Sequence, residues 1–191
     1  MQIMLASTSP FRRALLGRLG LPFACVPPEV DETPGPREAP DQLALRLALA
    51  KAQAVAHRHP QTVVIGSDQV AVLDGTLLGK PGDHTHAVAQ LVHVSGRRVD
   101  FYTGLCVLVA ANPLPHTHLD TTRVTFRTLT GAEIERYLRA DEPYQCAGSF
   151  KSEALGISLC ERIETEDPTA LVGLPLIALS RLLRAAGLAL P

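Results

Sequence analysis

The sequence has little net charge, few aromatic residues and no tryptophan. Eighteen basic side chains nearly balance nineteen acidic ones, so the formal net charge is −1, and the sequence pI is about 6.6. A chain with this balance has no overall positive field to attract a long nucleic-acid backbone. We therefore expect no nucleic-acid polymer as a partner, and any anion site must be built locally.

Paired cysteines and long apolar runs are also missing. No stretch of membrane-spanning length is free of charged residues, and the N-terminus lacks the basic and apolar regions of a signal peptide. The cysteines form no CxxC pair and have apolar neighbours, which predicts buried, reduced thiols and favours the cytosol. They are Cys25, Cys106, Cys146 and Cys160. We predict a cytoplasmic protein with no membrane partner.

The length and the apolar content are sufficient for one substantial core. At 191 residues with 46% hydrophobic residues, the chain is predicted to form a single domain over residues 1–191. Its first part alternates between strands and helices. Strands are expected at 3–6, 23–26, 62–65 and 70–73, and helices at 10–20, 41–57 and 85–94.

The second part begins with two long β-rich runs. Residues 98–110 and 117–129 are separated by Asn112 and Pro113, which indicates an antiparallel hairpin. Thr130 and Glu133 form a capping box that begins a helix ending near residue 140. A strand over 157–163 and a final helix over 175–187 follow. The order of elements predicts an α/β fold with a mixed β-sheet flanked by helices.

The segment Ser7–Arg13 is the first candidate site. A strand is followed by hydroxyl groups, by a helix start capped by Ser9, and by Arg12 and Arg13. Free N–H groups at a helix N-terminus and neighbouring guanidinium groups bind phosphate oxygens well. The segment therefore predicts a triphosphate-binding site, although an ordinary capped helix with solvated arginines has the same pattern.

Acidic residues form the second candidate site. Asp68 follows the apolar run 62–65, which we expect to end at the polar residues 66–69, and Glu32 lies in an acidic, proline-rich loop over 27–40. One or two carboxylates together with substrate phosphates usually hold Mg²⁺. The alternatives are a turn-forming Asp68 and a solvated Glu32.

Lysines are scarce, since 15 of the 18 basic residues are arginine. Lys51 lies at the border of the apolar face of a predicted helix, and Lys80 follows Gly79 on a turn. Because a compact ammonium group suits phosphate oxygens, both lysines are candidates for phosphate binding. Residues 75–81 resemble a P-loop, but they are one residue short, lack a Ser or Thr after Lys80, and have Pro81 there instead. The P-loop interpretation therefore fails. Lys80 could still bind phosphate, and the alternative is that it is a solvated lysine on a turn.

Two further kinds of chemistry have less support. His84 and His86 lack a third metal ligand at a suitable spacing. Neither Cys146 nor Ser149 has a neighbouring histidine to act as its base, so we do not expect covalent catalysis.

Several segments in the same order along nearly the whole chain resemble the Maf family of nucleotide pyrophosphatases. They are Ala6–Pro10 with Arg12 and Arg13, Glu29–Glu32, Ala50–Ala52, Gly66–Gln69, Gly79–Pro81, Tyr102–Gly104 and Ala147–Phe150. Each segment is common alone, whereas their combination is specific. The resemblance implies a mixed-sheet α/β fold with two lobes around a deep cleft, related to inosine triphosphate pyrophosphatases and often dimeric.

The resemblance also implies roles for individual residues. Asp68 would be the proton acceptor, and Glu32 would join Asp68 in holding a divalent metal cation, Mg²⁺ or Mn²⁺. The phosphate-binding residues would be Ser7, Arg12, Arg13, Lys51 and Lys80. The expected reaction is hydrolysis of a nucleoside triphosphate between the α and β phosphates, which releases a monophosphate and pyrophosphate.

The segments 67–69 and 146–153 are similar to the branch of the family that prefers 7-methyl-GTP. In that branch the positions that set the base preference correspond to Phe11, Gln69 and Glu153. An aromatic face and a carboxylate suit the cationic 7-methylguanine ring. The alternatives are a pyrophosphatase for dTTP, UTP or inosine-type triphosphates, and a nucleotide-binding regulator of cell division and septum formation.

Overall fold

A computed structural model describes residues 2–109 and 112–190. The chain divides into two compact units, and we describe each by itself. Unit 1 comprises Met1–Gln69, Tyr102–Asp120 and Asp167–Pro191, and unit 2 comprises Val70–Phe101 and Thr121–Glu166. In the described part of the chain, no helix has the length and apolar character needed to cross a membrane.

A mixed β-sheet of seven strands confirms the predicted fold class. The strand order is β2-β1-β3-β5-β6-β7, and β4 pairs with β3. Strands β1 and β2 and strands β1 and β3 are parallel, whereas β4 and β7 are antiparallel to their partners. The strands are β1 (Gln2–Leu5), β2 (Phe23–Cys25), β3 (Thr62–Leu73), β4 (Thr76–Leu78), β5 (Arg98–Val109), β6 (Asn112–Phe126) and β7 (Cys160–Glu164).

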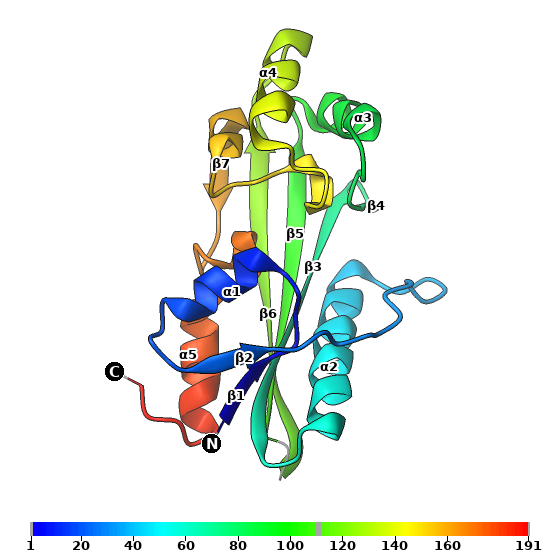
Figure 1. Cartoon of the computed structure of the whole chain (residues 1–191). Helices are drawn as coiled ribbons and strands as arrows, with labels where there is room; N and C mark the ends of the chain where they lie inside the picture. Colours follow the sequence, from blue (N-terminus) through cyan, green and yellow to red (C-terminus); the bar gives the residue numbers. More distant parts are fainter. Residues whose placement is uncertain (1, 110–111, 191) are drawn as a thin grey trace. The chain divides into compact units, whose positions relative to one another are not determined.

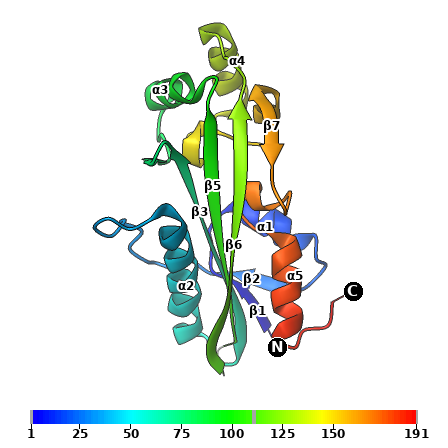
Figure 2. The same cartoon turned by 180° about the vertical axis from the view of Figure 1, so that it is seen from behind.

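In unit 1 helices cover both faces of the sheet. Helix α2 (Pro40–Arg58) lies on one side of β1 and β3, and helices α1 (Pro10–Gly17) and α5 (Leu176–Ala185) lie on the other (Figure 1; Figure 2). Successive side chains of a strand point to opposite faces, so Ile3 and Leu5 pack with α1 and α5, and Met4 packs against α2. The sheet of unit 1 therefore has a separate apolar core on each face.

Within the described residues, unit 2 contains two helices and two 3₁₀ turns. Its helices are α3 (His84–Val94) and α4 (Gly131–Asp141), and 3₁₀ turns cover Ala147–Ser149 and Leu155–Leu159. Thr130 and Glu133 form the predicted capping box at the start of α4. A third 3₁₀ turn, Ala170–Val172, belongs to unit 1.

The structure corrects the predicted end of the third strand. Residues 62–65 and 70–73 are one strand, β3, which runs through Asp68, so Asp68 lies within a strand rather than at its end. The polar residues 66–69 do not interrupt the strand because their side chains find partners inside the protein. The Ser67 hydroxyl lies within hydrogen-bond distance of two carbonyls, and the Gln69 NH₂ lies within hydrogen-bond distance of a hydroxyl and two carbonyls. Strand β4, which we did not predict, pairs with β3 across the Asp74–Gly75 turn.

Smaller corrections concern element ends and thiols. Residues 157–159 are 3₁₀ turn rather than strand, and Asn112 begins β6 rather than separating the hairpin strands. The hairpin itself agrees with the prediction, since β5 and β6 are neighbours joined within two residues, which only antiparallel strands allow. All four cysteines are free thiols, but only Cys106 is buried and Cys25 is exposed.

Candidate active site

The candidate site lies where β1 ends. Strand β1 leads through α1 to its neighbour β2 on one side, and its neighbour on the other side is β3. This change of direction is a topological switch point, where open α/β sheets bind ligands beyond the carboxyl ends of their strands. The oxygens of Ser7 and Ser9 organise the turn: Ser9 N donates to Ser7 Oγ over 3.1 Å, and Arg12 N donates to Ser9 Oγ over 3.3 Å. The predicted cap of α1 is confirmed.

Strand β3 presents different chemistry on its two faces. Val64 packs in the core against α2, and Asp68 contacts Lys51 of that helix. Ile65 packs in the opposite core, and Gln69 bonds to groups on that side. The alternation of a strand therefore places Asp68 and Gln69 on opposite faces, although they are neighbours in the sequence.

Lys51 joins the two predicted metal ligands in one cluster. Its Nζ lies 2.6 Å from Asp68 Oδ1 and 2.5 Å from Glu32 Oε1. Lys51 is only 5% exposed and Asp68 only 8%, so water screens the charges of this pair weakly, whereas the Glu32 side chain is half exposed. The structure thus brings together three residues that are far apart in the sequence.

Two glycines allow α2 to approach the sheet closely enough for this cluster. A Cβ atom on Gly66 of β3 would lie 2.1 Å from Ala48 O, and one on Gly104 of β5 would lie 2.2 Å from Ala44 O. No side chain fits at either position, because both contacts are far shorter than any van der Waals distance. The close approach places Lys51, one turn beyond Ala48, beside Asp68.

The carboxylates of Asp68 and Glu32 suit a divalent cation. In the described part of the chain no group of three or more His, Cys, Asp or Glu side chains could hold a metal. A two-carboxylate site completed by phosphate oxygens is nevertheless the usual way in which proteins bind Mg²⁺ with nucleotides. The donor set therefore fits a metal that is bound together with a triphosphate.

Arg12 is held near this cluster by the backbone. Its Nε donates to Gly173 O over 2.8 Å. Burial lowers the pKa of Arg12 from its usual value, while the nearby Asp68 and Glu32 carboxylates oppose this shift. Arginine remains charged under such conditions, so the guanidinium adds a fixed positive charge near the Asp68 and Glu32 carboxylates.

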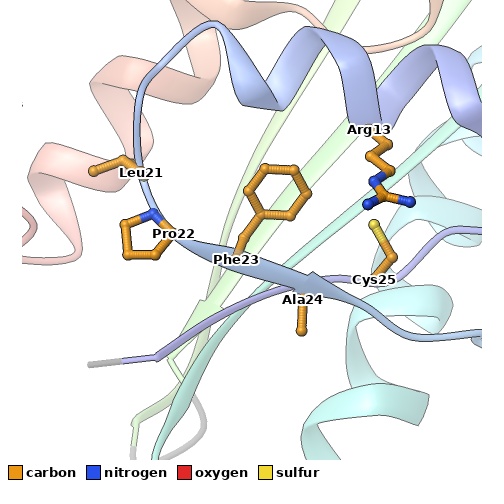
Figure 3. A pocket seen from close by; sticks show the side chains of 6 residues that line it. All are labelled: Arg13, Leu21, Pro22, Phe23, Ala24 and Cys25. Atoms are coloured by element: carbon orange, nitrogen blue, oxygen red, sulfur yellow. The ribbon is translucent and has the colours of Figure 1, made fainter.

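Arg13 occupies a different environment. It is exposed and lines a cavity of about 540 Å³ with residues 21–25. Figure 3 shows its guanidinium pointing toward the thiol of Cys25, at the end of edge strand β2. The cavity contains neither the carboxylates nor Lys51, so we place the candidate chemistry at the Lys51 cluster. The phosphate contact predicted for Arg13 stays a prediction.

Among the residues predicted to read the base, Gln69 has the best-defined surroundings. Its Nε2 lies within 3.1 Å of three acceptors, namely Thr103 Oγ1, Ala170 O and Leu171 O. Phe11 is half-buried on α1. Their proposed contact with a base stays a prediction.

Lys80 and Glu153 belong to unit 2, and both are exposed. Lys80 follows Gly79, whose carbonyl accepts hydrogen bonds from Gly148 N and Gln90 Nε2. These bonds fix the turn that carries Lys80. That both residues share a site with Lys51 stays a prediction from the family resemblance.

Sequence reasoning assigned no individual role to several buried polar residues of unit 1. Ser67 Oγ donates to Gly104 O and Gly173 O, and Thr103 Oγ1 donates to Ala170 O. Asp167, only 3% exposed, accepts three hydrogen bonds. Asp167 followed two residues later by Thr169 is a local turn pattern, but nothing in the sequence connects it with Gln69 or Arg12.

The structure is an α/β domain whose switch point carries paired carboxylates, a buried lysine and an arginine at a helix start. The model of the Maf-like protein family matches residues 2–186. The chain belongs to the Maf family.

Its relatives include two proteins named 7-methyl-GTP pyrophosphatase. The one from Polaromonas sp. is 58% identical over 98% of this chain and 86% of its own length. The one from Xanthomonas axonopodis pv. citri is 57% identical over 100% of this chain and 99% of its own length. Among solved structures, a HAM1 protein from Coxiella burnetii shares 16% identity with a TM-score of 0.50, over 66% of this chain and 73% of that one. This last likeness concerns the fold alone.

Proposed function

We propose that the protein is a nucleoside triphosphate pyrophosphatase that hydrolyses 7-methyl-GTP to 7-methyl-GMP and pyrophosphate. The observation that carries the proposal is the cluster in which Nζ of the buried Lys51 lies within 2.6 Å of both the buried Asp68 and the more exposed Glu32. The substrate is inferred from relatives 54–58% identical to this chain that are named 7-methyl-GTP pyrophosphatase.

In this proposal Asp68 accepts a proton from the attacking water. Its carboxylate is held by Lys51 and is largely shielded from solvent, so its position is fixed before the substrate binds. General-base catalysis of this kind is typically worth about 10²- to 10⁴-fold in rate. The water attacks the α phosphorus, and pyrophosphate leaves.

The positive groups act on the phosphates. Phosphoryl transfer depends on charge neutralisation and alignment more than on covalent help. Arg12, Arg13, Lys51 and Lys80 supply positive charge, and Ser7 supplies a hydroxyl beside the start of α1. A divalent cation held by Asp68 and Glu32 would neutralise further negative charge on the substrate.

Phe11, Gln69 and Glu153 are proposed to recognise the base. Methylation at N7 gives guanine a delocalised positive charge, which is attracted to an aromatic face and to a carboxylate. Glu153 would accept hydrogen bonds from the guanine N1–H and amino groups. The proposed order of preference is 7-methyl-GTP, then GTP, then pyrimidine triphosphates.

A substrate panel tests the reaction. Purified protein is incubated with Mg²⁺ and, separately, 7-methyl-GTP, GTP, inosine triphosphate, UTP and dTTP, and all products are identified. We expect a monophosphate and pyrophosphate, fastest with 7-methyl-GTP. A diphosphate and inorganic phosphate as first products would refute the proposed reaction, and binding without turnover would favour the regulator.

Variants test the base contacts. Phe11→Ala should weaken discrimination by roughly 0.5 to 2 kcal/mol, and Phe11→Trp, the matched aromatic control, should keep or improve it. Glu153→Gln should also lower the preference for 7-methyl-GTP. Identical kcat/KM ratios for 7-methyl-GTP, GTP and UTP in wild type and all three variants would mean that neither residue reads the base.

A further inference from the structure

The segment 167–176, which we call the carbonyl loop, supplies backbone acceptors to side chains from three other elements of unit 1. Ala170 O and Leu171 O accept hydrogen bonds from Gln69 of β3, and Ala170 O also accepts one from Thr103 of β5. Gly173 O accepts bonds from Arg12 of α1 and from Ser67 of β3. The two donors lie 2.8 and 2.9 Å from this oxygen.

The carbonyl loop is itself held by two buried or half-buried side chains. Asp167 Oδ1 accepts from Thr169 N over 3.0 Å and from Thr169 Oγ1 over 2.6 Å, and its Oδ2 accepts from Ile177 N over 2.7 Å. Thr169 Oγ1 accepts in turn from Leu176 N over 2.8 Å. These bonds connect the beginning of the loop to the first residues of α5.

The carbonyl loop decides which way the amide of Gln69 faces. Carbonyl oxygens can only accept hydrogen bonds, so the group that faces Ala170 O and Leu171 O must be the NH₂ of Gln69 rather than its oxygen. The hydroxyl of Thr103 uses its proton on Ala170 O and therefore also presents a lone pair to the NH₂. Both amide hydrogens are used within the protein, and Oε1 is the atom that Gln69 offers to a ligand.

Arg12 is constrained by the same loop. Gly173 has a φ of +115°, and a Cβ atom on it would lie 3.3 Å from Arg12 Nε, so the backbone approaches the guanidinium closely. Among the described hydrogen bonds, none joins the Asp68 side chain to the loop, because this side chain faces α2 on the opposite side of β3. The loop therefore acts on groups proposed to bind the substrate and not directly on the proposed base.

We propose that the carbonyl loop is the element that positions substrate recognition in this protein, with Asp167 and Thr169 as its positioning residues. The loop holds Gln69 so that Oε1 faces the nucleotide base, which must present a hydrogen-bond donor there, and it holds Arg12 for the phosphates. This inference rests on the proposed pyrophosphatase function. It adds that Asp167 and Thr169 influence base specificity without touching the substrate.

Matched variants separate positioning from simple stability. Thr169→Val removes the hydroxyl that connects Asp167 to Leu176 N, whereas Thr169→Ser keeps it. Thr103→Val is a second, nearly isosteric change that removes the hydroxyl beside Gln69. Thr122→Val is the control, because it removes a buried hydroxyl on β6 that donates to Thr165 in unit 2.

We expect Thr169→Val and Thr103→Val to raise KM and to lower kcat/KM for 7-methyl-GTP relative to UTP by about 3- to 10-fold, the range for one lost hydrogen bond. Turnover at saturation should change less than about twofold, because Asp68 faces away from the loop. Thr169→Ser and Thr122→Val should keep the wild-type ratio. Thermal unfolding of every variant shows whether it is folded.

Binding of an α,β-methylene triphosphate analogue is measured in parallel, so that the two proposals can be judged separately. If wild type binds the α,β-methylene analogues of 7-methyl-GTP and UTP but hydrolyses no triphosphate, the proposed function fails. The role of the loop is then judged only from the ratio of the two binding affinities in each variant. If folded Thr169→Val and Thr103→Val keep the wild-type ratios, or lose kcat equally for all bases, the carbonyl loop is only structural. If wild type binds no nucleotide, both proposals fail.

Discussion

At the scale of single residues, Lys51 is the centre of the molecule's most demanding electrostatic arrangement. Removing a charge from water costs several kcal/mol unless a partner compensates it, and here one ammonium group compensates Asp68 and the more exposed Glu32. Such a cluster contributes little net stability compared with apolar packing. The cluster lies near the switch point of the sheet, where open α/β sheets bind ligands, and this position supports the proposed role of its residues in catalysis.

Asp68→Asn tests the proposed base. The substitution keeps the shape of the side chain but removes the proton acceptor, so kcat should fall by about 10²- to 10⁴-fold. Asp74→Asn is the matched control, since Asp74 is exposed in the β3–β4 turn and pairs with Arg97. Wild-type turnover of Asp68→Asn would show that Asp68 is not the base, and an effect on KM alone would make it mainly a metal ligand.

At the scale of elements, the packing of α2 against the sheet depends on the absence of side chains at Gly66 and Gly104. Carbonyl oxygens of α2 occupy the space that a Cβ would need at both positions. Both glycines face α2, on the same side of the sheet as Asp68. The same contact therefore stabilises the fold and sets the distance between Lys51 and Asp68.

Gly66→Ala should accordingly destabilise the protein and lower its activity. Forcing one methyl group into a packed interior typically costs about 1–3 kcal/mol, and a backbone carbonyl cannot easily move aside. Gly17→Ala, in α1 where nothing lies within 4 Å of the new Cβ, should leave stability unchanged or raise it slightly. Denaturant unfolding of both variants measures the difference. Equal stability for the two would contradict the close packing of α2.

The cap of α4 should make a pH-dependent contribution. Hydrogen bonds from Thr130 N and from the Thr130 hydroxyl, together with Arg127, lower the pKa of Glu133 from 4.5 to about 2. A carboxyl whose pKa is lower in the folded state stabilises that state above its unfolded pKa and loses this contribution as the pH falls through its folded pKa. Glu133→Gln should therefore lower Tm at neutral pH.

This difference in Tm should shrink as the pH falls from 4.5 toward about 2. Thermal unfolding across that range measures it. Glu161→Gln, at an exposed position on β7, controls for the loss of one negative charge. A Tm difference that does not change with pH would contradict the role of the ionised carboxylate in the cap.

At the scale of the whole molecule, unit 1 contains the switch point, the carboxylate cluster, Arg12, Gln69 and the carbonyl loop. Strands β3, β5 and β6 contribute residues to both units. Unit 2 carries Lys80 and Glu153 on its turns. In the proposed enzyme, unit 1 would therefore carry the chemistry and most of the residues proposed to contact phosphates.

Removal of divalent metal should stop turnover without unfolding the protein. Lys51 already compensates both carboxylates, so the fold needs no cation there. Excess chelator should abolish hydrolysis, Mg²⁺ or Mn²⁺ should restore it, and Tm should hardly change. Calorimetry should show that Mn²⁺ binds more tightly when an α,β-methylene analogue is present, because phosphates complete the site. Full activity after chelation would exclude the metal role.

The sequence alone was sufficient for features that depend on neighbouring residues and on periodicity. The cap at Ser9, the capping box at Thr130 and the mixed α/β order were predicted because short-range backbone bonds and apolar patterns specify them. The motif order also identified the family. Lys51 and Asp68 were both named as candidates, but nothing local showed that they touch.

Only the tertiary structure decided the properties that depend on contacts between distant segments. The polar run 66–69 resembled a strand end, and it continues as strand because Ser67 and Gln69 find acceptors in the carbonyl loop, about a hundred residues later in the chain. The opposite orientation of Asp68 and Gln69 follows from that continuation. A buried polar side chain can be satisfied by any acceptor that the fold brings near it, and sequence spacing carries no information about which one it will be.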